Sequence, residues 1–121
     1  MKKRILVVED QDDNRRIMRD LLTSAGFDLI QATNGEEGVR MAKGDRPDLI
    51  LMDIQMPVLD GYAATRRIKA LPELRDTPII VVTSYALSGD DVKAREAGAD
   101  GYVSKPFSPR ELLAKIRQFL P

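Results

Sequence analysis

The chain repeats one pattern five times: a short apolar run, a turn, and a stretch in which apolar residues recur with helical spacing. The apolar runs lie at residues 5–8, 29–32, 49–52, 79–82 and, more weakly, 101–103. Three of these runs are continuous rather than alternating, as in parallel strands that helices cover on both faces. The pattern predicts an α/β fold, and right-handed crossovers favour one open, doubly wound parallel sheet.

The intervening segments carry helix signals of different strength. Ile17, Leu21 and Ala25 lie four residues apart, with Met18 and Leu22 beside them, which predicts the apolar face of the first helix. Ser88 gives the fourth helix only a weak capping box, whereas residues 108–111 (SPRE) combine a serine cap, a proline and a glutamate at the start of the fifth.

Composition narrows the function classes. The 121 residues suit one domain, and 43% hydrophobic with 31% charged residues is an ordinary globular balance. Lysine plus arginine and aspartate plus glutamate both total 19, so a strongly cationic nucleic-acid binder is not expected. The absence of cysteine and histidine excludes thiolate metal sites and histidine-based catalysis. No apolar stretch is long enough to cross a membrane, and we expect a cytoplasmic protein.

Polar side chains cluster in sequence where the predicted strands end. Glu9 and Asp10 follow the first strand, Asp53 the third, Thr83 the fourth and Lys105 the fifth. The carboxyl ends of parallel strands share one edge of a sheet, where such folds bind ligands. Three carboxylates at one place repel one another unless a cation lies among them, and oxygen donors favour Mg²⁺, with Mn²⁺ possible. A cation, a lysine and a hydroxyl would suit a phosphoryl group, which an aspartate can accept as nucleophile.

Each of these residues also has an ordinary interpretation when taken alone. An acidic pair after a strand is most often a solvated loop or a helix start, and a single aspartate before a turn is most often a cap. Thr83 suits a strand interior, and Tyr102 suits a half-buried strand position. It is the joint occurrence at successive strand ends that favours a site.

With these motifs the chain resembles the receiver domain of two-component response regulators. The resemblance covers residues 3–120 and rests most specifically on residues 53–61 (DIQMPVLDG) and 105–107 (KPF). Weaker support comes from residues 7–10 (VVED), 83–86 (TSYA) and 97–102 (AGADGY). The resemblance implies a flavodoxin-like sandwich of five helices around a five-stranded sheet in the order 2-1-3-4-5.

The resemblance also implies roles. Asp53 would accept a phosphoryl group from a phosphohistidine of a histidine kinase or phosphotransfer protein. Asp10 would bind Mg²⁺ directly and Glu9 through water, with Asp53 and the backbone carbonyl of Gln55 completing the protein ligands. Lys105 would contact the phosphoryl group. We expect the bond from Lys105 to Pro106 to be cis.

The resemblance further implies a switch. Thr83 would move toward the phosphorylated site and let Tyr102 turn inward, so that the surface of the fourth helix, fifth strand and fifth helix changes for a downstream protein target. Ser84 stands where the family often has alanine or glycine, and with Tyr85 and Gln55 it flanks the site.

Other functions remain open from the sequence. The chain could be a phosphorylation-independent interaction module of the same fold, or a receiver excised from a hybrid histidine kinase. A flavin carrier is disfavoured by the acidic loop at residues 11–13, and a phosphatase by Gln55, because that enzyme class usually needs aspartate there. We expect one receiver domain over residues 1–121 without an output domain, no turnover of an external substrate, no nucleic-acid or membrane binding, and a monomer or phosphorylation-linked dimer.

Overall fold

The computed structural model describes residues 2–54, 56, 58–83 and 90–121, the backbone alone at residues 90 and 91. The described strands are β1 (Arg4–Val8), β2 (Asp28–Ala32), β3 (Leu49–Asp53), β4 (Ile79–Thr83) and β5 (Gly101–Ser104). The described helices are α1 (Asp12–Ser24), α2 (Gly35–Asp45), α3 (Gly61–Lys69), α4 (Asp90–Glu96) and α5 (Pro109–Phe119), with a 3-10 turn, η1, at Pro72–Leu74. The predicted alternation of strand and helix is confirmed.

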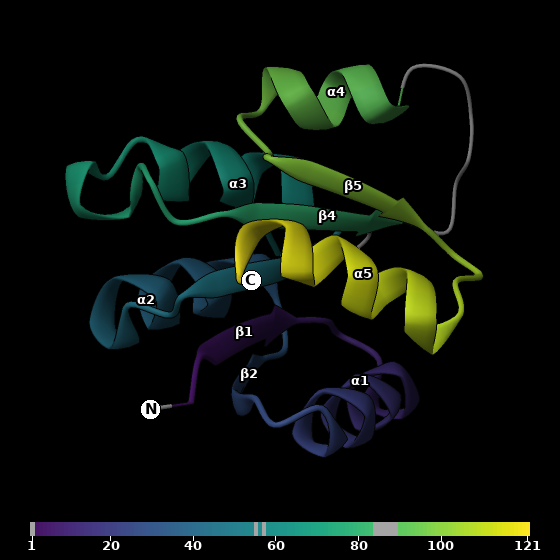
Figure 1. Cartoon of the computed structure of the whole chain (residues 1–121). Helices are drawn as coiled ribbons and strands as arrows, with labels where there is room; N and C mark the ends of the chain where they lie inside the picture. The colour runs from purple at the N-terminus through teal and green to yellow at the C-terminus, as the bar shows by residue number, and fades with distance from the viewer. Residues whose placement is uncertain (1, 55, 57, 84–89) are drawn as a thin grey trace.

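The strands form one parallel sheet in the order β2-β1-β3-β4-β5, which confirms the expected topology. Because every strand runs in the same direction, the carboxyl ends of β1, β3 and β4 meet at one edge of the sheet (Figure 1). Asp53 and Thr83 are the last residues of their strands. The fold therefore brings together side chains that are far apart in the sequence.

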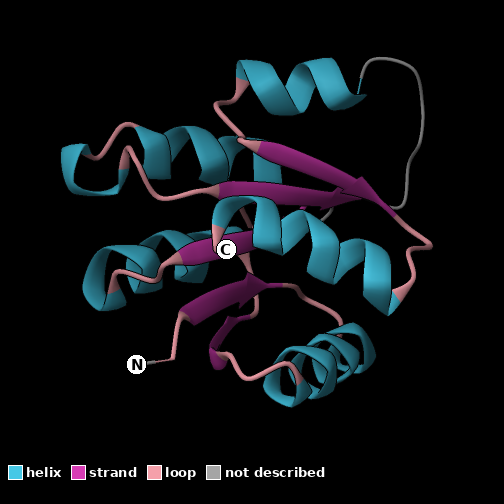
Figure 2. Ribbon diagram, viewed as in Figure 1, coloured by secondary structure: helices cyan, strands magenta, loops and turns pink. Residues whose placement is uncertain are grey.

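Helices cover both faces of the sheet, as the continuous apolar strands require (Figure 2). On one face, α1 and α5 bury Met18, Leu22, Leu112 and Ile116 against the sheet. On the other face, α2 and α3 do the same, while α4 lies against a smaller cluster through Ala94. The short side chain of this alanine offers little apolar area, so the described side chains of α4 bury less than those of the longer helices.

The first helix departs from the expected burial pattern. Met18 and Leu22 form its buried face, whereas Ile17 is 63% exposed and Ala25 is the C-cap residue beyond the helix. The helix is therefore rotated so that the row beginning at Met18, not the row beginning at Ile17, faces the sheet. Ser88, the weak cap predicted for the fourth helix, lies outside the described residues.

A glycine at the start of α3 lets this helix approach the end of β3. A Cβ atom added to Gly61 would lie 2.1 Å from the backbone oxygen of Asp53 and 2.8 Å from the Cα of Ile54. The Gly61 amide donates to the carbonyl oxygen of Ile54 at 2.9 Å. The backbone that carries Asp53 is thus in direct contact with α3.

The opposite, amino-terminal edge of the sheet is tied by Lys69. Its ammonium donates to the backbone carbonyls of Arg75 at 3.1 Å and Thr77 at 2.7 Å, and to the Asp100 carboxylate at 2.7 Å. Asp100 also accepts from the Ile79 amide at 2.9 Å. One lysine therefore joins the end of α3, the start of β4 and the turn between α4 and β5.

Candidate functional site

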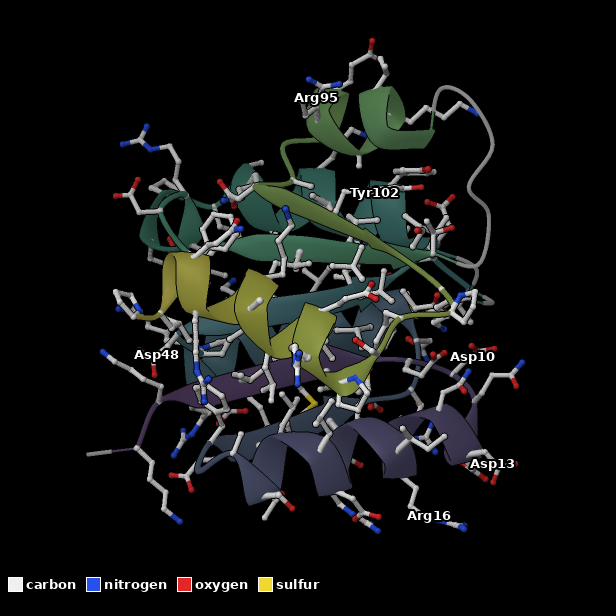
Figure 3. The ribbon with its side chains drawn as sticks, turned by 45° about the vertical axis from the view of Figure 1, so that its right-hand side comes forward. Asp10, Asp13, Arg16, Asp48, Arg95 and Tyr102 are labelled. Atoms are coloured by element: carbon white, nitrogen blue, oxygen red, sulfur yellow. The ribbon has the colours of Figure 1, made fainter. Side chains whose placement is uncertain are left out.

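The predicted acidic residues meet at the carboxyl edge of the sheet. Glu9, Asp10 and Asp53 each offer a carboxylate oxygen, and these atoms all lie within 4.8 Å of one another. Figure 3 shows Asp10 at the edge where β1 ends, with Asp48 at the opposite edge. Since the site needs β1 and β3 to be neighbours in the sheet, its geometry follows directly from the strand order.

Lys105, the residue after β5, completes the cluster at the same edge of the sheet. Its Nζ atom lies 2.9 Å from Oε1 of Glu9 and 3.8 Å from Oδ1 of Asp53. The Lys105 amide donates to the carbonyl of Thr83 at 2.6 Å, which fixes the lysine beside the end of β4. The bond from Lys105 to Pro106 is cis, as expected, and Pro106 is exposed.

Burial gives the carboxylates unequal acidities. Glu9 is 1% exposed and Asp53 is 7% exposed. Burial, followed by a hydrogen bond to Glu9 and repulsion by its charge, raises the pKa of Asp53 to about 7. Burial also acts to raise the pKa of Glu9, but hydrogen bonds from Asp53 and Lys105 outweigh it and leave that pKa below its ordinary value. Of these two carboxyls, the surroundings favour the protonated form of Asp53 and the ionised form of Glu9.

Asp10 is the acidic residue with an unused oxygen. Its Oδ1 atom is buried and accepts no hydrogen bond from the described residues. Burial and then the neighbouring Glu9 raise the pKa of Asp10. A buried acceptor without a donor is costly in free energy, and a bound cation would satisfy it. This oxygen and the three converging carboxylates fit a hard divalent ion such as Mg²⁺.

The two residues expected to form the switch lie on adjacent strands. Thr83 is buried at the end of β4, and Tyr102 is half-buried in the middle of β5, where it is paired with Val81. Tyr102 packs against the small cluster of Ile54, Val81 and Ala94 that also supports α4. Thr83 therefore borders the acidic cluster, whereas Tyr102 borders the surface formed by α4 and β5.

Three predicted site residues cannot be placed. Gln55, Ser84 and Tyr85 lie outside the described residues. Their roles as a backbone ligand and as flanking side chains stay predictions.

Sequence reasoning missed one cation beside the site. The Nη1 atom of Arg15, on α1, donates to the backbone carbonyl of Glu9 at 2.7 Å. No residue pattern indicates this bond, because its acceptor is a backbone carbonyl and Arg15 is one of three arginines on α1.

Comparison with known proteins decides the family. The profile of the response regulator receiver domain matches residues 5–117. The chain belongs to this family. The polar-differentiation response regulator DivK of Brucella anthropi is 40% identical to this receiver domain over 120 residues, which are 99% of this chain and 98% of the relative.

Solved receiver domains share its fold closely. The receiver domain of sensor histidine kinase PA1611 from Pseudomonas aeruginosa has 39% identity and a TM-score of 0.93, and the match covers 99% of this chain and 98% of that one. That structure holds a magnesium ion in its active site cleft. The chemotaxis protein CheY4 of Vibrio cholerae has 27% identity and a TM-score of 0.93, with 98% and 99% coverage.

These similarities establish the general function. The chain is a receiver domain of response regulators, a phosphorylation-based signalling switch, and not a typical substrate-turnover enzyme. Among the described helices, none combines the length and the apolar character that crossing a bilayer requires.

Proposed function

We propose that Asp53 is the phosphoryl acceptor of this receiver domain. The observation that carries the proposal is the convergence of Lys105, Glu9 and Asp10 on this nearly buried carboxylate. An acceptor needs cationic groups near the incoming phosphoryl oxygens, and Lys105 supplies one at 3.8 Å from Asp53.

The transfer itself is a simple exchange of bonds. A carboxylate oxygen of Asp53 forms a bond to the phosphorus of a phosphohistidine, the phosphorus–nitrogen bond breaks, and its electron pair returns to the imidazole nitrogen. Asp53 must first lose its proton, because its pKa is raised to about 7 and only the ionised form attacks. Lys105 and the hydroxyl of Thr83 then donate hydrogen bonds to phosphoryl oxygens.

The acidic residues would hold Mg²⁺ during this reaction, with Mn²⁺ as a substitute. Asp10 would be a direct ligand, Glu9 a ligand through water, and Asp53 and the carbonyl of Gln55 the remaining protein ligands. When bound, the ion would neutralise charge on the phosphoryl oxygens. The magnesium ion in the PA1611 receiver supports this assignment.

The partners we propose follow from the same chemistry. The phosphodonor is a histidine kinase or a histidine phosphotransfer protein, which the similarity to the receiver of a sensor histidine kinase supports. The phosphorylated state would act on a downstream protein through the surface of α4, β5 and α5, by the coupled movement of Thr83 and Tyr102. Residues 1–121 would act as one receiver unit that supports its own phosphorylation and dephosphorylation without turning over an external substrate.

The remaining expectations from the sequence stay predictions. They are the absence of nucleic-acid and membrane binding, the cytoplasmic location, and the choice between a monomer and a phosphorylation-linked dimer.

Phosphorylation of the full chain tests the proposal. The protein is incubated with acetyl phosphate and MgCl₂, and incorporation is measured by intact-protein mass spectrometry. We expect one phosphoryl group on the native protein and none on Asp53→Asn. Asp20→Asn is the matched control, because it removes an exposed carboxylate on α1 far along the helix from the site.

Equal incorporation by the native protein and Asp53→Asn would refute the assignment. Absence of incorporation in the native protein, together with partner binding that Asp53→Ala leaves unchanged, would favour the phosphorylation-independent module instead.

A further inference from the structure

The loop between β1 and α1 is held by Arg15 of α1. One guanidinium nitrogen of Arg15 donates to the backbone carbonyl of Glu9 at 2.7 Å, and the other pairs with the carboxylate of Asp12. The side chain of Arg15 is only 15% exposed, whereas that of Asp12 is 83% exposed. A planar, rigid guanidinium therefore spans from the end of β1 to the first turn of α1.

The start of α1 lacks an ordinary side-chain helix cap. Asn34, Asp60 and Ser108 each accept a backbone amide hydrogen at the start of their helices, α2, α3 and α5. Gln11, the N-cap residue of α1, makes no side-chain cap hydrogen bond. Among the α-helices with a described cap residue, α1 alone lacks this bond, and its start is the one that follows Glu9 and Asp10.

The hydrogen bond from Arg15 to the Glu9 carbonyl lies beside acidic side chains that repel one another, so their positions depend on such restraints. Lys105 restrains Glu9 from the inner side through its side chain. Asp10 has a buried oxygen with no hydrogen-bond partner among the described residues. Arg15 binds the carbonyl of the peptide that joins Glu9 to Asp10, so it fixes the direction in which the chain enters Asp10.

We propose that Arg15 is a positioning residue for the divalent-cation site, holding the Glu9–Asp10 peptide in the orientation that lets Asp10 reach the ion. This inference rests on the proposed function, because it assumes that Asp10 is a ligand. It assigns Arg15 a role in metal affinity and in selection for small ions, since Mg²⁺ requires near-ideal octahedral geometry and Ca²⁺ accepts irregular geometry.

The sign of the effect separates positioning from simple charge. A cation near a metal site repels the metal ion, so removing the charge of Arg15 should by itself tighten metal binding. Loss of positioning has the opposite sign. Residues that orient metal ligands typically contribute 10-fold to 100-fold to metal affinity.

The test measures Mg²⁺ and Ca²⁺ binding to the full chain by titration calorimetry, well below the melting temperature. The variants are Arg15→Gln and its matched control Arg16→Gln. Arg16 is exposed on the same helix, and Figure 3 shows it directed away from the sheet. Arg15→Lys is added because it keeps the positive charge but loses the planar guanidinium that contacts both Glu9 and Asp12. It replaces Arg15→Gln in the test if that variant does not fold.

We expect Arg15→Gln to weaken Mg²⁺ binding roughly tenfold, with a much smaller loss for Ca²⁺. Arg15→Lys should show a smaller loss with the same preference, and Arg16→Gln should be unchanged or slightly tighter. Unchanged or tighter Mg²⁺ binding in Arg15→Gln overturns this proposal, and so does an equal loss for both ions, which would indicate general loosening of the fold.

The wild-type titration separates this proposal from the one on which it rests. If wild-type protein binds neither ion, the metal site itself is wrong and both proposals fail. If wild type binds Mg²⁺ and Arg15→Gln binds it equally well, only the role of Arg15 is lost.

Discussion

Asp53 is the residue at which burial and charge oppose each other most directly. Its carboxyl lies at the end of a fully buried strand, beside the charge of Glu9 and 3.8 Å from the ammonium of Lys105. Its pKa is therefore raised to about 7 by burial first and by Glu9 second. If Asp53 is the phosphoryl acceptor, as proposed, it would react as an anion although its surroundings favour the protonated form.

This pKa predicts a pH dependence of stability without metal. The folded protein keeps the Asp53 proton up to about pH 7, whereas an unperturbed aspartate releases it near 3.8. As pH rises across that interval, the unfolded chain is favoured, so Asp53 lowers the free energy of unfolding. Asp53→Asn should therefore gain stability over wild type between pH 5 and 8, by on the order of 2 kcal/mol.

Urea denaturation of both proteins in EDTA, at pH 5 and at pH 8, measures this difference in the free energy of unfolding. Adding MgCl₂ at pH 8 should restore part of the stability of the wild-type protein, because the ion supplies positive charge in place of the lost proton. Parallel pH profiles for the two proteins would show that the pKa of Asp53 is not raised.

Thr65 carries a buried hydroxyl group without a hydrogen-bond partner among the described residues. It lies fully buried on α3. Valine has the same shape without the hydroxyl, so Thr65→Val should raise the free energy of unfolding by about 1 kcal/mol. Thr65→Ser keeps the hydroxyl and loses a methyl group, so it should destabilise by about 1 kcal/mol. Chemical denaturation compares the three proteins, and a destabilised Thr65→Val would reveal a hydrogen bond or water at this site.

At the scale of elements, the contact between α3 and the end of β3 constrains the backbone that carries Asp53. The helix begins with Gly61, whose missing side chain leaves room for the backbone of Asp53 and Ile54. Asp60 caps the same helix by accepting the Ala63 amide at 2.9 Å. The position of α3 and that of Asp53 are therefore coupled through main-chain atoms.

Gly61→Ala should disturb both stability and function. The new Cβ atom would meet the Asp53 oxygen at 2.1 Å, so the strand end or the helix must shift. We expect a loss of about 3 kcal/mol in stability and slower phosphorylation by acetyl phosphate in the molecules that remain folded. Gly44→Ala is the control, because its Cβ atom meets nothing within 4 Å in α2. That variant should gain up to about 1 kcal/mol, and similar behaviour of the two variants would rule out the contact.

At the scale of the whole molecule, the site and the α4–β5 surface are linked through two strands. Thr83 ends β4 beside the acids, and its carbonyl accepts the Lys105 amide from the segment after β5. Tyr102 lies in β5 against the cluster that supports α4. A change at the acids can therefore reach α4 through neighbouring strands, without a separate domain.

This arrangement predicts a distributed response to a phosphoryl mimic. Beryllofluoride with Mg²⁺ should change hydrogen exchange in α4, β5 and the start of α5 of wild-type protein. Thr83→Ala should still bind the mimic but lose most of that change. A response in Thr83→Ala equal to that of wild type would show that the threonine does not couple the two regions.

The sequence predicted the sheet and the acidic cluster for a simple reason. Continuous apolar runs identify buried parallel strands, and a parallel sheet necessarily brings the residues after each strand to one edge. Glu9, Asp10, Asp53 and Lys105 are therefore placed by topology alone, and the structure brings them together as expected.

Features that depend on side-chain detail were not predictable in this way. The exposure of Ile17 depends on a small rotation of α1, and two adjacent rows of apolar residues left that rotation undetermined. The bond from Arg15 to the Glu9 carbonyl depends on a backbone group that no residue pattern encodes. The close approach at Gly61 likewise depends on how near two elements come.

The lysine tie at the amino-terminal edge has a mechanical consequence for α4. Lys69 and Asp100 anchor the turn just after this helix to α3 and β4, while little apolar area holds the helix itself. If α4 moves, we therefore expect it to tilt about its carboxyl-terminal end, so that its amino-terminal end moves furthest. Spin-label distances can test this, measured from a fixed position in the sheet to each end of α4. We expect the distance to the amino-terminal end to change more than the distance to the carboxyl-terminal end. In Lys69→Met, the two distance changes should be more nearly equal.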